Sequence, residues 1–252
     1  MRRTVPILAA ALALSAAPAF PQEASERSPS IVYESYFQVP SSQMPAWREI
    51  YYRHVAPVLG ELREEGTIQG WAALTHVYGD NYNWRSALRF YEWSDIEAGF
   101  GAFFERMRAR MSDEEWEEWG KLGVGHRDEI WSVGPNTPPR EEFAYLQTGL
   151  FQVAAGRMGE WNELFDGVAA PALNEAVENG TLGGWVVLRH HTGGKHNWKI
   201  LYFFKDWDSI DDFFEGFVER LQESGAMTQF GDMIRSHRDY IWEPVPTEPA
   251  EG

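Results

Sequence analysis

Two histidines, His76 and His190, stand in matching sequence contexts 114 residues apart, each two residues after a leucine. Imidazole titrates near neutral pH, so a histidine in a pocket can take up and release protons during a reaction. We therefore predict His76 and His190 as candidate catalytic residues. The alternative is that each is a structural histidine held by hydrogen bonds, because the strand face on which it is expected is otherwise apolar.

A second group of candidates combines tryptophan with cationic side chains along expected strands. Successive side chains of a strand point to opposite faces, which puts Leu74 and His76 on the face toward the helices and Trp71 on the other. An enclosed face of aromatic and cationic groups suits a flat, partly anionic organic molecule. The predicted ligand-binding residues are Trp71, Arg89, Trp185, Arg189 and Phe203. The alternative is that these side chains only close a seam between two halves of the chain.

The triplet His126-Arg127-Asp128 returns as His237-Arg238-Asp239. Protein kinases have such a triplet in their catalytic loop, but this chain has no glycine-rich phosphate loop, which excludes a kinase. A structural interpretation pairs the Arg and Asp side chains across the junction of the two halves while His caps a helix end. The role of the triplets stays open. The sequence has no HExxH motif, no His-x-His and no paired-carboxylate spacing, so we predict neither a metal nor a cofactor.

The matching positions belong to an internal repeat. Asn83-Trp84 recurs as Asn197-Trp198, and after a three-residue deletion the spacing falls from 114 to 111 for the His-Arg-Asp triplets. Ten of the twelve tryptophans form five matched pairs, at positions 47/161, 71/185, 84/198, 93/207 and 131/242. This regularity predicts that one unit of about a hundred residues occurs twice. Asn83 and Asn197 are expected to serve turns by bonding their own backbone.

Each copy is expected to contain the same elements in the same order. The strands expected in the first copy are residues 32–39, 71–78, 84–93 and 129–133. Residues 47–62 have helical spacing, with a kink or fresh helix start at Pro57, and a second helix begins after Trp93. The order β-α-β-β-α-β is that of a ferredoxin-like domain. We predict an α+β fold in which two ferredoxin-like βαββαβ repeats pack sheet to sheet as an intramolecular pseudo-dimeric α/β barrel.

The predicted domain organisation follows from the repeat and from the composition of the remaining segments. It comprises a signal peptide (1–19), a flexible tail (20–30), repeat 1 (31–134), a Pro-rich linker (135–142), repeat 2 (143–245) and a C-terminal tail (246–252).

In this element order, and in a strand that ends in Trp before a helix, the chain resembles the dimeric α/β-barrel superfamily, including its antibiotic-biosynthesis monooxygenase-like and EthD-like groups. The segments that carry the resemblance are Tyr91-Glu92-Trp93-Ser94-Asp95-Ile96-Glu97 and Lys205-Asp206-Trp207-Asp208-Ser209-Ile210-Asp211. The resemblance covers nearly all of residues 31–245 and implies a tandem duplication in place of a homodimer. It also implies a range of activities, among them cofactor-free oxygenases, haem-degrading enzymes, isomerases and decarboxylases. The haem-degrading branch has a His about ten residues after the Trp, which neither Met107 nor the segment near Phe217 supplies, so its catalytic residues are not carried over.

Residues 1–19 have the pattern of a secretory signal: two arginines, an apolar stretch and Ala17-Pro18-Ala19 before the expected cleavage site. We therefore expect a secreted or periplasmic protein. The formal net charge of −16 opposes binding to nucleic acid or to anionic membranes, and the chain has no cysteine for disulfides or a lipid anchor.

The function predicted from these features is the binding of a small organic ligand by a monomer with an internal pseudo-two-fold axis. One alternative is a cofactor-independent oxygenase or isomerase on the same scaffold. The other is a structural or interaction module with a packed interior.

Overall fold

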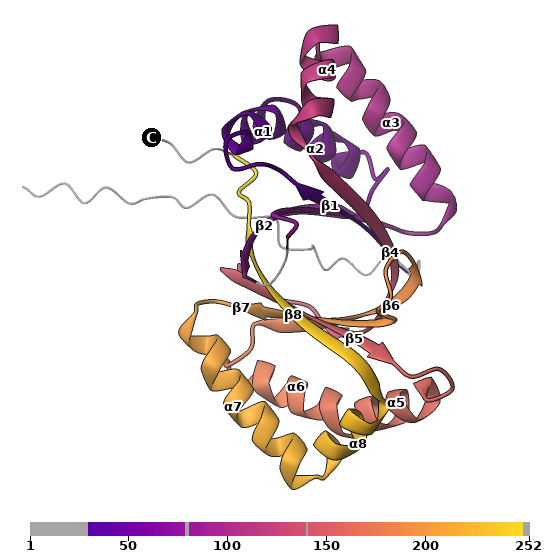
Figure 1. Cartoon of the computed structure of the whole chain (residues 1–252), viewed down its shortest axis with the longest axis vertical. Helices are drawn as coiled ribbons and strands as arrows, with labels where there is room; N and C mark the ends of the chain where they lie inside the picture. Colours follow the sequence, from indigo (N-terminus) through magenta and orange to yellow (C-terminus); the bar gives the residue numbers. More distant parts are fainter. Residues whose placement is uncertain (1–29, 79–80, 140, 249–252) are drawn as a thin grey trace, which may run out of the picture.

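The computed structural model describes residues 30–78, 81–139 and 141–248, so the expected signal peptide lies outside the described residues. Eight antiparallel strands close into a barrel in the order β1-β3-β2-β8-β5-β7-β6-β4, and the helices lie outside it (Figure 1). The prediction of an α+β fold with a closed barrel is confirmed.

The first half of the chain supplies four neighbouring strands and the helices that cover them. Its elements are β1 (Ile31–Gln38), α1 (Met44–Ile50), η1 (Tyr51–Val55), α2 (Ala56–Glu64), β2 (Gly70–Tyr78), β3 (Trp84–Phe90), α3 (Ser94–Arg110), α4 (Asp113–Leu122) and β4 (Gly125–Thr137). The second half follows the same order, as predicted. Its elements are β5 (Tyr145–Val153), α5 (Met158–Leu164), η2 (Phe165–Ala169), α6 (Ala170–Glu178), β6 (Gly184–Thr192), β7 (Trp198–Phe204), α7 (Asp208–Glu223), α8 (Ala226–Met233) and β8 (Ile234–Pro244).

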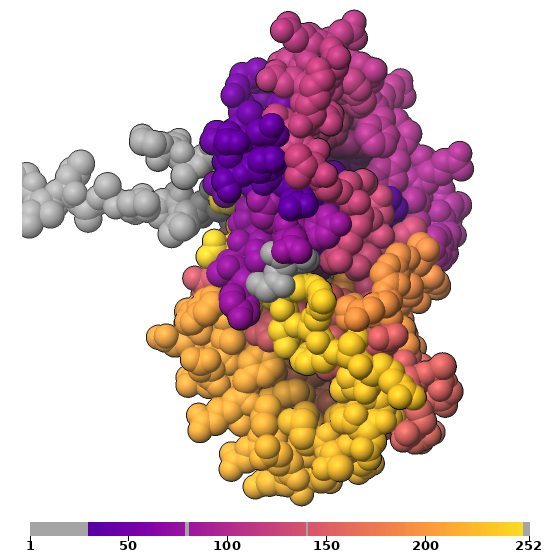
Figure 2. Space-filling view, in the orientation of Figure 1, coloured from indigo at the N-terminus to yellow at the C-terminus, as the bar shows by residue number. Residues whose placement is uncertain are grey.

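The two halves meet along two seams, where β2 pairs with β8 and β4 pairs with β6. The helices of the first half cover one side of the barrel and those of the second half cover the opposite side (Figure 1). In the space-filling view these two groups form an indigo-to-magenta lobe and an orange-to-yellow lobe on either side of the strands (Figure 2). The molecule thus has three cores: one under each group of helices and one inside the barrel.

Each half contains one turn of π-helix, η1 or η2, directly before a proline in the next helix. Pro57 has no backbone N–H, so the regular i→i−4 ladder cannot pass through it. The N–H of Ala56 instead reaches back five residues to the carbonyl of Tyr51, and Ala170 does the same to Phe165. The helical backbone nevertheless runs from Met44 through η1 to Glu64 without a break, so the predicted fresh helix start at Pro57 is wrong and a π turn takes its place. A π turn widens the helix and turns side chains out of their usual register.

Two details of the strands differ from the sequence-based expectation. Strand β4 continues to Thr137 instead of ending at Val133, and Pro135 lies where its register with β6 shifts, a place where a missing N–H breaks no ladder bond. The side chain of Asn83 bonds the backbone of Val39, accepting from its N–H at 2.8 Å and donating to its carbonyl at 2.7 Å. Asn83 therefore clamps the end of a distant strand, and the expectation that it bonds its own turn is wrong.

Candidate functional site

The interior of the barrel is filled by a buried charge network. Its centre is Glu34, on β1, which is fully buried and accepts hydrogen bonds from Arg85 on β3 and from Lys199 on β7. The Lys199 ammonium also donates to Glu129 at 3.1 Å and to the Tyr36 hydroxyl at 3.1 Å. These contacts join the halves, because Lys199 belongs to the second half and its partners to the first.

The charges of this network stabilise one another. Burial raises the pKa of Glu34, but Arg85 and Lys199 lower it more strongly, to about 2. Burial lowers the pKa of Lys199, an effect that Glu34 and Glu129 oppose. The ammonium also lies over the ring of Trp131, 3.9 Å from its centroid, in cation–π geometry.

The barrel interior leaves a cavity of only about 60 Å³, lined in part by Arg85 and Arg89. Sites for small molecules are usually several hundred Å³. The barrel interior is therefore not the ligand pocket that strand alternation predicts. The reason is the size of the side chains that fill it, among them Trp131 and Trp242.

The predicted ligand-binding residues are divided between two faces. Arg89 and Phe203 point into the barrel as predicted. Trp71 and Trp185 instead pack beneath the helices, and Arg189 is exposed with its guanidinium over Trp198. The prediction fails for β2 and β6 because both faces of these strands are buried and carry apolar residues. Polar and apolar residues therefore do not alternate along them, and the sequence does not indicate which face points into the barrel.

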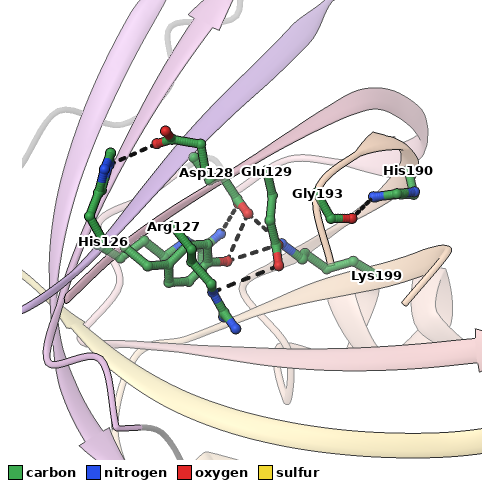
Figure 3. Close-up of polar contacts among 10 residues, drawn as sticks. His126, Arg127, Asp128, Glu129, His190, Gly193 and Lys199 are labelled. Atoms are coloured by element: carbon green, nitrogen blue, oxygen red, sulfur yellow. Dashed lines mark hydrogen bonds and ion pairs between the residues drawn. The ribbon is translucent and has the colours of Figure 1, made fainter. Parts of the chain in front are cut away.

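His76 and His190 lie on the barrel side of β2 and β6, half-buried near the strand ends. Their rings contact Trp242 and Trp131 at centroid distances of 5.3 and 5.1 Å. His190 also hydrogen bonds the carbonyl of Gly193 (Figure 3). The expectation that they face the helices is wrong, and neither lines either of the two cavities that lie between the strands and the helices. Their catalytic role stays a prediction.

A larger cavity, which we name the first cavity, lies between the strands of the first half and helices α1–α4. Its volume is about 390 Å³ and its walls are mostly aromatic. It is lined by Tyr33, Ser35, Phe37, Trp47, Tyr51, Val55, Leu59, Trp84, Ser86, Leu88, Phe100, Phe103, Phe104, Trp119, His126 and Asp128. The π turn η1 contributes Tyr51 and Val55, so the irregular helix is part of the wall.

A second cavity of about 450 Å³ occupies the corresponding place in the second half. It is lined by Gln147, Phe151, Trp161, Phe165, Ala169, Ile200, Tyr202, Phe214, Phe217, Val218, Leu221, Met227, Phe230, Gly231, Ile234, His237 and Asp239. Most of these positions are the repeat equivalents of residues that line the first cavity. Each cavity therefore contains the His and the Asp of one His-Arg-Asp triplet.

The triplets lie in strands, which separates their three side chains. His126 and Asp128 point toward the helices, whereas Arg127 and Glu129 point into the barrel toward Lys199 (Figure 3). His126 Nε2 lies 3.0 Å from Asp128 Oδ1. The expectation that Arg pairs with Asp while His caps a helix is wrong, because residues two apart in a strand share a face and those one apart do not.

The first His–Asp pair is held in place from both ends. The ring of His126 stacks on Phe37 with a centroid distance of 4.6 Å and an interplanar angle of 14°. Asp128 accepts a 2.7 Å hydrogen bond from the Ser35 hydroxyl, and the Tyr33 phenol lies near the same carboxylate. Burial and the neighbouring Asp128 raise the pKa of Tyr33 to about 12, so the phenol keeps its proton and remains a donor at neutral pH.

The second pair has the same stacking with fewer supports. His237 stacks on Phe151 at 4.3 Å, and its Nε2 lies 3.2 Å from Asp239 Oδ1. Gly149 replaces the serine that holds Asp128, and Gln147 replaces Tyr33. The first cavity thus presents the more firmly positioned acid–base pair.

His126 stands at the rim of the first cavity. Its side chain is 49% exposed, and it also lines a more open groove beside α4, together with Trp116 and Trp119. A histidine in this position can take a proton from a molecule inside the cavity and pass it to solvent. Sequence reasoning singled out the triplets without assigning this role. The signal that could have found it is the spacing of two between His126 and Asp128, which places both on one face only because β4 begins at Gly125 and not at the expected residue 129.

Two further kinds of feature are absent from the described part of the chain. Within it, no three His, Cys, Asp or Glu side chains are grouped so that they could hold a metal ion. None of its helices is long and apolar enough to cross a membrane.

Comparison with known proteins identifies the fold. No protein-family model matches the sequence, and no curated protein does either. Among solved structures, a protein from Fusobacterium nucleatum subsp. nucleatum ATCC 25586 described as a "putative monooxygenase" superposes with a TM-score of 0.60, at 12% identity over 89% of this chain and 95% of the other. A "putative monooxygenase" from Lactobacillus acidophilus NCFM gives 0.59, at 7% identity over 88% and 98%.

A chlorite dismutase from Candidatus Nitrospira defluvii gives a TM-score of 0.56, at 10% identity over 86% of this chain and 92% of the other. These neighbours belong to the dimeric α/β-barrel superfamily, so this chain has the fold of that superfamily. At such low identities the likeness describes the fold and does not transfer an activity.

Proposed function

We propose that the protein binds a small, planar, largely apolar organic molecule in the first cavity and that the His126–Asp128 pair removes a proton from it. The observation that carries this proposal is a positioned His–Asp pair at the rim of an aromatic cavity of about 390 Å³. Aromatic walls favour a flat ring system. A molecule of this kind with an acidic hydroxyl or C–H group gives the histidine something to deprotonate.

Each residue of the site has one role in the proton transfer. Neutral His126 accepts the proton of the ligand, and the Asp128 carboxylate stabilises the imidazolium that forms. Ser35 keeps the carboxylate in position by donating a hydrogen bond to it. Because His126 is half-exposed, the proton then passes to water, and the ligand remains as its anion until it is reprotonated or reacts.

4-Nitrophenol tests this proposal, because the molecule is planar and only its anion absorbs visible light. We expect the wild-type protein to bind it and to hold more of it as the anion than the His126→Gln variant does at the same pH. The matched control is His237→Gln, which leaves the first cavity intact. If the wild type does not bind the phenol, the proposed binding function is wrong, and if both variants ionise it equally, His126 is not the base.

A second candidate function is oxygenation without a cofactor, which the fold shared with two proteins described as monooxygenases favours. An electron-rich carbanion formed by deprotonating an activated CH₂ group can react with O₂, giving a carbonyl group and releasing the second oxygen atom as water. Oxygen uptake with naphthol and anthrone-type compounds tests this candidate. Uptake by the wild type that is lost in His126→Gln supports it, and uptake that is unchanged in the variant contradicts it.

The origin and destination of the chain are also proposals. The shared element order of the halves and the matched cavities support a tandem duplication that replaces a homodimer. The residue pattern of positions 1–19 supports export. Separate expression of the two halves, followed by a test for a stable complex on mixing, examines the first proposal. N-terminal sequencing of the protein recovered outside the cytoplasm examines the second.

A further inference from the structure

The two cavities share their construction but differ in polarity at several equivalent positions. Tyr51 of the first cavity corresponds to Phe165 of the second, and Ser86 corresponds to Ile200. Ser35, which holds Asp128, corresponds to Gly149. At these places only the first cavity has a hydroxyl group, whereas Tyr202 of the second cavity corresponds to Leu88 of the first.

Two of the polar groups in the first cavity have no hydrogen-bond partner within the described part of the chain. They are the hydroxyl of Tyr51 and the indole N–H of Trp47, and both are buried. Buried donors of this kind are uncommon in folded proteins and call for an explanation. Both side chains line the cavity, so a bound molecule is the partner that the structure leaves room for.

The two donors belong to one wall. Trp47 in α1 and Tyr51 in η1 are four residues apart, and both rings pack edge-on against Trp84, with centroid distances of 6.0 and 5.0 Å. Burial raises the pKa of the Tyr51 phenol well above its usual range, so it remains protonated and can only strengthen as a donor when an anionic oxygen approaches. Two hydrogen-bond donors on one wall of the cavity suit a ligand with an acceptor oxygen.

The second cavity keeps only half of this arrangement. The indole N–H of Trp161 also lacks a partner within the part of the chain that the structure describes. Phe165, however, takes the place of Tyr51 and packs against Trp198 at 5.4 Å in the same manner. The neighbouring wall is made of Met227 and Phe230. This wall therefore has one donor fewer, whereas the strands of the second cavity contribute the polar side chains Gln147 and Tyr202.

We propose that Tyr51 and Trp47 make the first cavity selective for ligands with a carbonyl or phenolate oxygen, a selectivity that the corresponding wall of the second cavity lacks because Phe165 replaces Tyr51. The inference rests on the proposed binding function and names the ligand class of the first cavity. During proton removal by His126, the oxygen bound by Tyr51 is also where negative charge can gather, because preorganised donors stabilise a developing oxyanion.

The test uses two probes that differ in a single carbonyl group, tetralin and 1-tetralone, with reciprocal variants. Indole N–H signals in nitrogen-15 NMR spectra, assigned with Trp47→Phe and Trp161→Phe, report binding in each cavity separately. We expect the preference for 1-tetralone over tetralin to be greater in the first cavity than in the second. Tyr51→Phe should weaken 1-tetralone binding in the first cavity by about two- to tenfold and leave tetralin unchanged, as expected for the loss of one hydrogen bond.

The reciprocal variant, Phe165→Tyr, should strengthen 1-tetralone binding in the second cavity by a similar factor. If both probes bind but neither substitution changes the preference between them, the inference is wrong and the proposed binding function stands. If neither probe binds in either cavity, both are wrong. Thermal unfolding of each variant shows whether it is folded, and Tyr51→Phe removes a single oxygen atom, so it serves as the test even if the larger side chain at position 165 disturbs the fold.

Discussion

The buried carboxylate of Glu34 provides a quantitative prediction, which we test with the substitution Glu34→Gln. The amide keeps the size of the side chain but removes the charge that holds Arg85 and Lys199. Both cations are buried and lose a partner. Breaking a buried ion pair from one side typically costs about 3–5 kcal/mol, because a charge is left in a poorly polarisable interior.

The pKa of Glu34 gives a second route to the magnitude. It falls from 4.5 to about 2 in the folded chain, and each pKa unit corresponds to about 1.4 kcal/mol, so the carboxylate contributes roughly 3 kcal/mol. Because the folded state has the lower pKa, this contribution is complete above a pH of about 4.5 and is lost as the pH falls toward about 2. We therefore expect Glu34→Gln to lose about 3 kcal/mol of unfolding free energy near neutral pH and less in acid.

Urea denaturation followed by tryptophan fluorescence, at neutral pH and again in acid, measures both effects. Glu175→Gln is the matched control, since Glu175 pairs with Arg220 on the surface and both side chains are about half-exposed. A surface pair of this kind contributes at most about 1 kcal/mol. If Glu34→Gln costs no more than the control, or if its cost is the same at all pH values, the buried network does not hold the barrel together as described.

Three further predictions concern the scaffold. Asn83→Ala removes both hydrogen bonds to Val39 and should lower the unfolding free energy by about 1–3 kcal/mol in urea denaturation; a loss below that range contradicts the clamp. Gly184→Ala places a methyl group 2.5 Å from the backbone nitrogen of Pro139, so its melting temperature should fall, and an unchanged value refutes the close approach. Burial and neighbouring cations lower the pKa of His196 to about 4. The protein should therefore lose stability as the pH falls from 6.5 toward 4, because the unfolded chain binds the proton more readily. A midpoint near the ordinary histidine value in an NMR titration of His196 contradicts this.

The order of the elements could be predicted from the sequence because local signals determine it. Pro57 marks an irregular turn within the first helical run through its missing N–H, and the tryptophan spacing relates one half of the chain to the other. The faces of β3 followed from alternation, since Arg85 and Leu88 differ in polarity. The faces of β2 did not, because Trp71 and Leu74 are both apolar and both buried, on opposite sides of the strand.

The central ion network could not be found by comparing the two halves. Glu34 has Thr148 as its equivalent, and Arg85 has Lys199, so the acid at the centre has no acidic counterpart. Glu34 is therefore not among the residues that match between the two halves. Its role depends on three-dimensional proximity across 165 residues of sequence, which periodicity does not encode.

The candidate site was only partly visible in the sequence. The His-Arg-Asp triplets and the pair His76 and His190 both recur between the halves, so recurrence alone does not indicate which histidines line a cavity. The cavity walls come from segments far apart in the chain, among them Phe37 of β1 and Phe103 of α3. Such a cavity appears only when helices and sheet are packed together.

The most direct test of the account is a crystal structure of the protein soaked with 1-naphthol. We expect a planar ligand to enter the space between the first four strands and their helices, close to His126. Electron density for the ring system should then lie among Phe37, Trp47 and Trp84, with the ligand oxygen near Tyr51 or His126. Density inside the barrel beside Glu34, or none in either lobe, contradicts it.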